Sequence, residues 1–258
     1  MFKSNLLELL NSVAKGQLSP QEARDRIHAQ SFIQADGGLN LDIQRRMRTG
    51  VSEVVFGPGK TLNQLECAIS ILAENNGPVM VTRLERSQGL ALLERFPQGN
   101  YLEVPGIFIV NKDINFQDIW PDQGRVMVVS AGGSDLPVAL EALVTCAFFD
   151  LDAGLVSDVG VAGLHRLFPW LEKLNQAEVI IVAAGMEGAL ASVVAGLCSR
   201  PVLAVPTSVG YGAGQGGLAA LMAMLSSCAP GVSVLNIDNG FGAACFAVKM
   251  LGKGDGRK

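Results

Sequence analysis

The carboxyl-terminal half of the chain repeatedly follows a short apolar run with a segment of helical pattern. The runs are RVMVVSAG, EVIIVAA, PVLAVPT and VSVLNIDN, beginning at residues 125, 178, 201 and 232. A strand that is apolar on both sides must be covered on both faces, and helices between parallel strands supply that cover. This alternation therefore predicts an α/β fold, a doubly wound parallel sheet between two layers of helices.

The first part of the chain is less regular. Helices are expected at 4–14 and from Pro20 onward, the second opened by a capping box of Ser19 and Glu22. Together these two helices resemble a helical hairpin. Residues 31–50 are polar, and we expect irregular structure there.

A smaller α/β pattern follows the hairpin. Strands are expected at 51–57, 78–83 and 106–110, with helices between them at 61–75 and 86–95. Because strands and helices alternate, this region predicts a small βαβαβ unit.

The polar stretch 111–124, which includes Pro121 and Gly124, is typical of a linker. We therefore expect two domains. The first, a helical hairpin plus a small α/β domain, is assigned to 1–120, and the second, a catalytic domain, to 121–258. Within the second, a short helix is expected at 165–174.

Composition excludes several classes of protein. With 20 basic and 24 acidic residues the formal net charge is −4, so no strongly basic face points to nucleic acid as a partner. Five cysteines without a C-x-x-C motif favour a reduced, cytoplasmic setting. The most apolar region, 178–209, is interrupted by Glu187, Arg200 and Pro206, so we expect no membrane span. The apolar excess instead predicts a buried sheet or contacts within an oligomer.

Glycine-rich sequences follow the predicted strands, where parallel sheets bind ligands. Two of the chain's glycine motifs look like phosphate-binding loops but depart from them. GPGKT (57–61) has Val54 where a P-loop needs glycine, and PTSVGY separates GAGQGG (212–217) from its strand. A loop whose backbone N–H groups meet phosphates stays open as an interpretation. Two histidines and scattered cysteines do not suit a structural zinc site.

Several polar residues near these strand ends have both a structural and a functional interpretation. Ser134 and Asp135 fit a helix cap as well as a ligand contact. His165 fits local hydrogen bonding or proton transfer near neutral pH. Asp238 and Asn239 fit a turn with an Asx-type cap or a place in the site.

Glu187 and Cys228 have the same two interpretations. Glu187 is the single charge in the run 179–199; it fits a solvated first helical turn or an acid or base with a raised pKa. Cys228 follows a helix in MLSSCAPG and fits a small buried apolar residue or a nucleophile. Its position at a helix end does not by itself favour a thiolate.

Five segments of the second half, taken together, resemble one enzyme family. They are SAGGSDLPVALEA (130–142), DVGVAGLHRL (158–167), VAAGMEGALASVVAGL (182–197), VPTSVGYGAGQGGLAALMAMLSSCAPGV (205–232) and NIDNGFGAACFA (236–247). The set resembles pyridinium-3,5-biscarboxylic acid mononucleotide synthase, the family that begins assembly of the nickel-pincer cofactor. A looser resemblance extends through LDIQRRMRTGVSEVVFGPGKT (41–61), although Ile43 and Gln44 stand where many family members carry histidines.

The second domain is also similar to the aminoimidazole ribonucleotide carboxylase family. The shared parts are a Gly-Ser-Asp strand end (133–135), a His-Arg pair (165–166) and an Ala-Gly-Met strand end (184–186). This similarity implies a flavodoxin-like three-layer fold and a homo-oligomer, an octamer. The settings of Glu187 and Cys228 are not shared with the purine enzymes.

The resemblance to the synthase implies a reaction. Nicotinic acid adenine dinucleotide would be carboxylated at ring carbon 5, with CO2 or bicarbonate as the second substrate. Its phosphoanhydride would be cut, releasing AMP. No tightly bound cofactor is expected, and Mg²⁺ would ease the cleavage by neutralising developing charge.

The same resemblance implies roles for individual residues. Cys228 would be the nucleophile that adds to the ring, and Glu187 and His165 would handle protons. Substrate binding is expected of Gly133, Ser134, Asp135, Arg166, Gly185, Met186, Thr207, Ser208, Tyr211, Gly212, Gly214, Asp238 and Asn239. Contacts to the AMP half or its phosphates are expected of Asp42, Arg45, Arg48 and Lys60, whose alternative is a solvated or salt-bridged surface.

Two other functions stay open from the sequence. One is an aminoimidazole ribonucleotide carboxylase or mutase, which would need no thiol. The other is a nucleotide-binding regulatory module without catalysis, because glycine-rich strand ends bind nucleotides whether or not a reaction follows.

Overall fold

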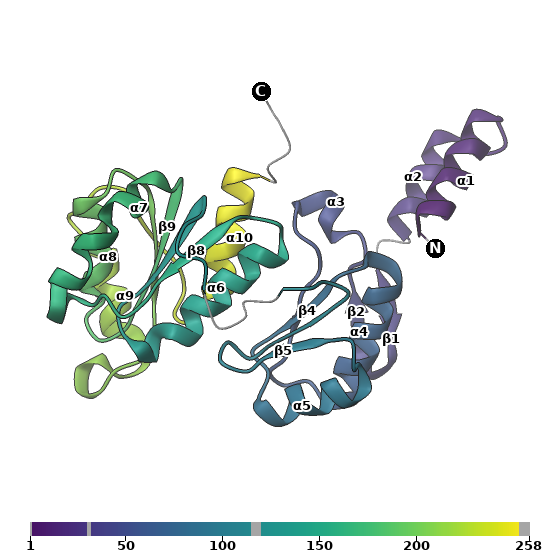
Figure 1. The fold of residues 1–258 in the computed structure, drawn as a ribbon. Helices are drawn as coiled ribbons and strands as arrows, with labels where there is room; N and C mark the ends of the chain where they lie inside the picture. Colours follow the sequence, from purple (N-terminus) through teal and green to yellow (C-terminus); the bar gives the residue numbers. More distant parts are fainter. Residues whose placement is uncertain (1, 30–31, 115–119, 253–258) are drawn as a thin grey trace. The chain divides into compact units, whose positions relative to one another are not determined.

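The computed structural model describes residues 2–29, 32–114 and 120–252 (Figure 1). The chain divides into two compact units, Met1–Asp113 and Ile114–Lys258. This division falls inside the segment 111–124 that has the composition of a linker. Each unit has a sheet of its own and is described by itself.

The second unit is built on a five-stranded sheet in which every neighbouring pair is parallel. Its strands are β7 (Val126–Ser130), β8 (Ala153–Val156), β9 (Val179–Ala184), β10 (Val202–Pro206) and β11 (Val232–Val234). The spatial order β11-β10-β9-β7-β8 is that of a flavodoxin-like sheet. The predicted fold class is therefore confirmed.

Helices cover both faces of this sheet (Figure 1). They are α6 (Leu136–Phe148), α7 (Leu171–Gln176), α8 (Ala189–Leu197), α9 (Leu218–Leu225) and α10 (Gly240–Leu251). Helices α6 and α10 pack together on one face, and α7, α8 and α9 lie on the other. None of the described helices is long and apolar enough to cross a lipid bilayer.

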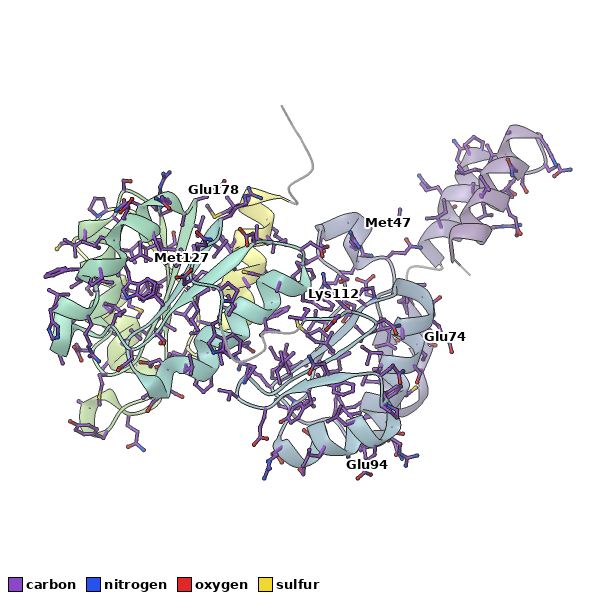
Figure 2. All side chains as sticks on the ribbon, viewed as in Figure 1. Met47, Glu74, Glu94, Lys112, Met127 and Glu178 are labelled. Atoms are coloured by element: carbon purple, nitrogen blue, oxygen red, sulfur yellow. The ribbon has the colours of Figure 1, made fainter. Side chains whose placement is uncertain are left out.

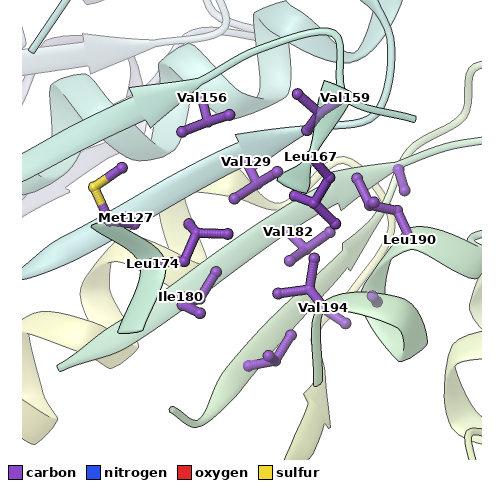
Figure 3. Close-up of a cluster of buried hydrophobic side chains, with 14 of the residues drawn as sticks. Met127, Val129, Val156, Val159, Leu167, Leu174, Ile180, Val182, Leu190 and Val194 are labelled. Carbon is purple, nitrogen blue, oxygen red and sulfur yellow. The ribbon is translucent and has the colours of Figure 1, made fainter. Parts of the chain in front are cut away.

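The core between the sheet and α7 and α8 explains why the strands are apolar throughout (Figure 3). Met127, Val129, Ile180 and Val182 point from β7 and β9 toward Leu174 of α7 and the residues of α8. Figure 2 labels Met127 within this core. It also labels Glu178, the residue just before β9, which lies at the edge of the unit.

The segment 165–174, predicted as one short helix, is instead broken into turns. It contains the end of a 3₁₀ helix, η3 (Val161–Arg166), a second 3₁₀ turn, η4 (Phe168–Trp170), and the start of α7. Pro169, at the start of η4, has no N–H to donate to residue 165, so the hydrogen bonds of one continuous α-helix cannot form here.

The first unit has a four-stranded sheet and four longer helices. The strands are β3 (Val55–Phe56), β4 (Val79–Thr82), β5 (Asn100–Leu102) and β6 (Ile107–Val110), in the order β3-β4-β6-β5. The longer helices are α1 (Phe2–Ala14), α2 (Pro20–Ala29), α4 (Leu62–Asn76) and α5 (Arg86–Arg95). Figure 2 shows Glu74 and Glu94 pointing outward from α4 and α5.

The prediction of a βαβαβ unit is wrong at its last strand. Only β3 and β4 are parallel, whereas β6 pairs antiparallel with both β4 and β5. The three-residue strand β5 is not seen in the sequence pattern, and a turn from Glu103 to Gly106 then reverses the chain. Gly106 has φ 62°, a backbone angle that glycine adopts most easily.

The segment 31–50 is also more ordered than expected, from residue 32 on. Strands β1 (Ile33–Ala35) and β2 (Leu39–Leu41) form an antiparallel hairpin around the turn η1 (Asp36–Gly38). A short helix, α3 (Arg45–Thr49), follows, and its Met47 is exposed. These elements are too short for the sequence periodicity to show them.

The core cluster predicts a large loss of stability for Ile180→Ala. Ile180 is fully buried in β9, so truncation leaves a cavity and lowers the free energy of unfolding by about 2–5 kcal/mol. Glu172→Ala, at an exposed position of α7, is the control and shifts it by less than about 0.5 kcal/mol. Chemical unfolding followed by circular dichroism measures both. Equal losses of unfolding free energy in the two variants would contradict the burial of Ile180 in this core.

Candidate active site

A cavity of about 330 Å³ opens at the carboxyl edge of the larger sheet. The strand order reverses here, because the chain goes from β7 to β8 on one side and returns to β9 on the other. Open α/β sheets bind ligands at such a point. The walls come from the segments that follow β7, β8, β9 and β10, and the lining residues are Ala131–Asp135, Asp158, Gly160–Ala162, Arg166, Ala184–Glu187, Ala189, Leu190 and Val209.

Asp135 forms the floor of this cavity and is only 4% exposed. Its Oδ2 accepts the N–H of Gly132 at 2.8 Å, and its Oδ1 accepts the hydroxyl of the fully buried Thr207 at 2.5 Å. Burial raises the pKa of Asp135, and the hydrogen bonds from Thr207 and Gly132 partly oppose that rise. Both carboxylate oxygens are engaged within the protein, so this residue shapes the floor.

The end of β9 has no room for a side chain. A Cβ on Gly185 would lie 2.2 Å from the carbonyl oxygen of Val209 and 2.7 Å from the hydroxyl of Thr207. The next residue, Met186, donates its N–H to the same Val209 carbonyl at 2.9 Å and has φ 55°. This close approach directs Met186 and Glu187 outward, and both line the cavity while remaining exposed.

A charged pair forms another wall. The guanidinium of Arg166 donates to Asp158 Oδ2 at 2.8 Å, and both side chains keep 40% or more of their surface exposed. Asp158 is held at φ 57°, and its N–H donates to the hydroxyl of Ser130 at 3.3 Å. A guanidinium oriented in this way and still open to solvent suits a phosphate or carboxylate group of a ligand.

The structure brings seven of the residues predicted for the site into the cavity wall. They are Gly133, Ser134, Asp135, Arg166, Gly185, Met186 and Glu187. Sequence analysis missed Asp158, Gly160 and Val209. Asp158 carried a usable signal, because it is the first charged residue after the apolar strand β8, as Asp135 is after β7.

The predicted residues after β10 and β11 mainly hold the loops. Ser208 donates its N–H to Asp238 Oδ1 at 2.7 Å, and Thr207 bonds to Asp135. Asn239 caps α10 by accepting the N–H of Gly242 at 2.8 Å, the structural one of its two interpretations. The described contacts therefore give these residues loop-building roles.

The glycine-rich turn η5 (Gly212–Gly217) lies against the end of β9. A Cβ on Gly214 would lie 3.3 Å from the carbonyl oxygen of Met186. Tyr211, at the start of this turn, is 78% exposed. Neither Tyr211, Gly212 nor Gly214 lines the cavity itself.

Of the three residues expected to be catalytic, only Glu187 lines the cavity. His165 is exposed on η3, beside Arg166. Cys228 is exposed after α9, and its neighbour Ser227 accepts a hydrogen bond from Ser192 of α8 at 2.8 Å. This hydrogen bond joins the residue before Cys228 to the first turn of α8, the helix whose Ala189 lines the cavity.

The other cysteines of the second unit differ from Cys228 in burial. Burial raises the pKa of Cys146 to about 12, with a smaller contribution from the neighbouring Cys245. Burial also raises the pKa of Cys198. Neither thiol is suited to act as a nucleophile at neutral pH.

In the first unit, the candidates for phosphate contacts are engaged within the protein. Arg48 pairs with Asp42, and Arg45 pairs with Glu53 at 3.2 Å. The ammonium of Lys60 donates to the carbonyl oxygen of Phe56 at 2.9 Å. For the two arginines the structure therefore favours the salt-bridged surface that was the alternative.

Two of the carboxylates that line the cavity, Asp135 and Asp158, have partners within the protein. Both oxygens of Asp135 are engaged, and Asp158 is paired with Arg166. Among the described residues no group of three or more His, Cys, Asp or Glu side chains could hold a metal ion. No step of the chemistry is therefore assigned to a protein-bound metal.

Comparison with known families accounts for both units. A family model described as "LarB/PurE-like N-terminal domain" matches residues 34–112, and one described as "AIR carboxylase" matches residues 125–257. The chain belongs to the LarB family. It is an enzyme of the carboxylase or mutase type with a nucleotide-related substrate.

Three similar proteins illustrate the two levels of likeness. An uncharacterized protein of Methanocaldococcus jannaschii is 40% identical over 251 residues, which is 94% of this chain and 95% of that protein. An N5-carboxyaminoimidazole ribonucleotide mutase of the same organism is 33% identical over 131 residues, 49% of this chain and 78% of the mutase. The corresponding mutase of Mycobacterium tuberculosis is 31% identical over 137 residues, 51% of this chain and 75% of that enzyme.

Two glycines in the second unit predict opposite effects of an added methyl group. Gly185→Ala places a Cβ 2.2 Å from a backbone oxygen, so we expect a loss of at least about 1–3 kcal/mol in unfolding free energy. Gly196→Ala, on α8 with nothing within 4 Å of the new Cβ, should gain up to about 1 kcal/mol. Unfolding midpoints of the two variants test this, and similar midpoints would contradict the tight strand end.

The buried Asp135 predicts a dependence of stability on pH. Its pKa is raised in the folded state above 3.8, so the folded protein holds this proton more tightly than the unfolded chain does. We compare the free energy of unfolding of the wild type with that of Asp135→Asn. The difference should fall as the pH rises from 3.8 through the pKa that Asp135 has in the folded protein, and then level off.

The matched variant for this measurement is Thr207→Val. It removes a hydrogen bond that lowers the pKa of Asp135, so the same fall should extend to higher pH. Both series are read from chemical unfolding at each pH. A stability difference that stays constant with pH would contradict the assignment.

Proposed function

We propose that this enzyme carboxylates carbon 5 of the pyridinium ring of nicotinic acid adenine dinucleotide and cleaves the phosphoanhydride. The products are AMP and pyridinium-3,5-biscarboxylic acid mononucleotide, in the first step of nickel-pincer cofactor biosynthesis. The observation that carries this proposal is the cavity of the second unit, which combines an exposed carboxylate, Glu187, with an exposed guanidinium, Arg166. The LarB-type first unit supports this substrate over that of the purine mutases, whose likeness covers only about half of the chain.

The cavity wall suits a flat ring and a phosphate. Gly132, Gly133 and Gly185 present backbone without side chains, so a planar ring could approach closely. Arg166, oriented by Asp158, would hold the mononucleotide phosphate. Ser134, an exposed hydroxyl at the start of the following helix, would bind a ribose or phosphate oxygen.

The proposed chemistry overcomes the low electron density of a pyridinium ring. A thiolate adds to ring carbon 4, forming a C–S bond and a neutral, enamine-like ring whose carbon 5 is nucleophilic. Carbon 5 then forms a bond to CO2. A base removes the hydrogen of carbon 5 as a proton, the C–S bond breaks, and the thiolate leaves as the ring becomes aromatic again. Glu187, an exposed carboxylate in the cavity wall, would accept that proton.

This mechanism needs Cys228 at a cavity that it does not line in its own chain. Helix α9, which leads to Cys228, exposes Leu218, Met222 and Leu225 by 59% or more on one stripe. An apolar stripe of this kind needs cover from a partner. We propose that a second copy of the chain covers it, so that Cys228 of one copy completes the cavity of another within the expected octamer.

In the phosphoanhydride cleavage, water adds to one phosphorus and gives up a proton to solvent, the bridging P–O bond breaks, and charge develops on the phosphate that leaves. Because the described carboxylates do not form a metal cluster, Mg²⁺ would arrive bound to the substrate phosphates. Arg166 would neutralise part of the remaining charge.

A second candidate is the purine reaction, favoured by the likeness to N5-carboxyaminoimidazole ribonucleotide mutases. It would use the same cavity but no thiol. A nucleotide-binding module without catalysis is the remaining alternative, and it would bind the dinucleotide without product formation.

The test is a defined incubation read by mass spectrometry. Purified protein is mixed with nicotinic acid adenine dinucleotide, bicarbonate and Mg²⁺, and we expect AMP together with a mononucleotide heavier by one CO2. AMP alone would indicate a hydrolase. Turnover of aminoimidazole ribonucleotides instead would establish the purine reaction, and neither activity in a folded oligomer would leave the binding module.

Variants separate the proposed roles. Glu187→Gln should lower the carboxylation rate by about 10²–10⁴-fold, because it removes the proton acceptor and keeps the side-chain shape. Cys228→Ser should abolish carboxylation with the fold intact, whereas Cys198→Ser, the matched control at a half-buried thiol, should stay close to the wild type. Full activity of Cys228→Ser would exclude the covalent route.

Mixing the two inactive variants tests whether the site is shared between copies. Glu187→Gln and Cys228→Ser protomers are unfolded together and refolded as mixed oligomers. If Cys228 of one copy serves the cavity of another, a fraction of the cavities regains both groups and activity returns. If both groups act within one chain, no mixed oligomer contains a complete site and activity stays absent.

A further inference from the structure

The loop that carries Cys228 is held at both of its ends by backbone hydrogen bonds. It joins α9 to β11 and spans residues 226–231. At its start, Ser226 donates its N–H to a carbonyl oxygen of the last turn of α9 at 3.1 Å. At its end, the carbonyl oxygen of Gly231 accepts the N–H of Val202, the first residue of β10, at 2.9 Å. These bonds fix the ends of the loop, and the position of its middle depends on other contacts.

The middle of the loop is organised around the hydroxyl of Ser227. Its Oγ accepts the N–H of Ala229 at 3.3 Å, which closes a short turn with Cys228 at its centre. Ser227 and Ala229 are half-buried, whereas Cys228 between them is exposed. The turn therefore anchors both neighbours of the thiol and leaves the thiol itself open to reaction.

A hydrogen bond from another helix holds this turn. The hydroxyl of Ser192 donates to Ser227 Oγ at 2.8 Å. Ser192 belongs to α8 and lies three residues after Ala189, which lines the cavity. A serine within a helix commonly bonds to a carbonyl oxygen of the preceding turn, but this hydroxyl reaches across to the next element. Both serines are partly buried, so water competes less with the bond than it would on an open surface.

Helices α8 and α9 also approach closely where α8 begins. A Cβ on Gly188, the residue after Glu187, would lie 3.0 Å from the carbonyl oxygen of Ala220 and 3.1 Å from the methyl group of Met224. The first turn of α8 is therefore packed directly against α9. Glu187 precedes one helix of this pair and Cys228 follows the other, and the hydroxyl of Ser192 connects the two.

We infer that Ser192 is a positioning residue, whose hydroxyl holds the turn around Cys228 and so fixes the thiol relative to α8 and α9. The inference rests on the proposed function, in which the sulfur adds to carbon 4 of the pyridinium ring. A displacement of about 1 Å from the reactive geometry can cost about 10²-fold in rate. Because the apolar stripe of α9 is the proposed contact with a second copy, the same bond would set where the thiol enters the cavity of that copy.

The first test is the steady-state rate of carboxylation by full-length Ser192→Ala. We expect kcat to fall about tenfold or more, with KM within about twofold of the wild type, because the groups proposed to bind the substrate are unchanged. Ser192→Thr keeps the hydroxyl and should restore most of the rate. Ser199→Ala is the matched control: it removes a serine hydroxyl that bonds to Asn175 of α7 at 3.1 Å, and it should keep the wild-type kcat.

The second test needs no activity. Hydrogen exchange of the segment 226–231, followed by mass spectrometry, should be about 2–10-fold faster in Ser192→Ala than in the wild type, and unchanged in Ser199→Ala. Combining Ser192→Ala with Ser227→Ala should change neither exchange nor kcat beyond the effect of Ser227→Ala alone, because Ser192 acts through Ser227. Additive effects would contradict this route.

Three results would overturn the inference. They are a wild-type kcat in Ser192→Ala, an equal loss of kcat in Ser199→Ala, and a lower unfolding midpoint of Ser192→Ala without any change in kcat, which would indicate a structural role alone.

The wild type separates this inference from the proposed function. If the wild type forms no carboxylated product, the synthase and the catalytic part of the inference are rejected together, and the exchange rates still show whether Ser192 holds the turn. Carboxylation by the wild type, with unchanged kcat and exchange in Ser192→Ala, rejects the inference and supports the synthase.

Discussion

One buried hydrogen bond, from Thr207 to Asp135, determines the shape of the candidate active site. The two residues follow β10 and β7, strands that are separated in the sheet by β9. Their bond passes beside Gly185 at the end of β9, where a Cβ would lie 2.7 Å from the Thr207 hydroxyl. The carboxylate of Asp135, the hydroxyl of Thr207 and the backbone of Gly185 thus fill the space at the ends of β7, β10 and β9. The cavity begins just beyond them.

This arrangement separates polar groups that build the cavity from polar groups that can act in it. Asp135 is buried, and both of its carboxylate oxygens accept hydrogen bonds within the protein. If Asp135 bound a ligand instead, the hydroxyl of Thr207 would lose its acceptor. Arg166, Asp158 and Glu187 reach the same cavity but stay exposed. Side chains that keep contact with water can change partners at low cost, so among the cavity residues the proposal gives Glu187 the proton transfer and Arg166, oriented by Asp158, the phosphate.

Sequence reasoning succeeded where a pattern is long enough to repeat. Four strands of the larger sheet and the helix at 86–95 follow from apolar runs and periodicity, whereas β8 was not among the expected strands. Glu187 stood out as the single charge after β9, and the family resemblance pointed to Gly185 and Arg166. It failed at β5, where three residues carry no period, and at Asp158. It could not place Cys228 relative to the cavity, because that depends on how α9 packs against α8 and not on local pattern.

Two residues at the rim of the cavity have strained backbone angles. Met186 and Asp158 both have φ near 55°, a conformation that costs about 1–3 kcal/mol for a residue other than glycine. Aspartate tolerates it through its short polar side chain, but methionine has no such compensation. A glycine at 186 would adopt this angle without that cost. The soft, partly exposed thioether of Met186 suits the face of a planar aromatic ring such as the proposed pyridinium substrate.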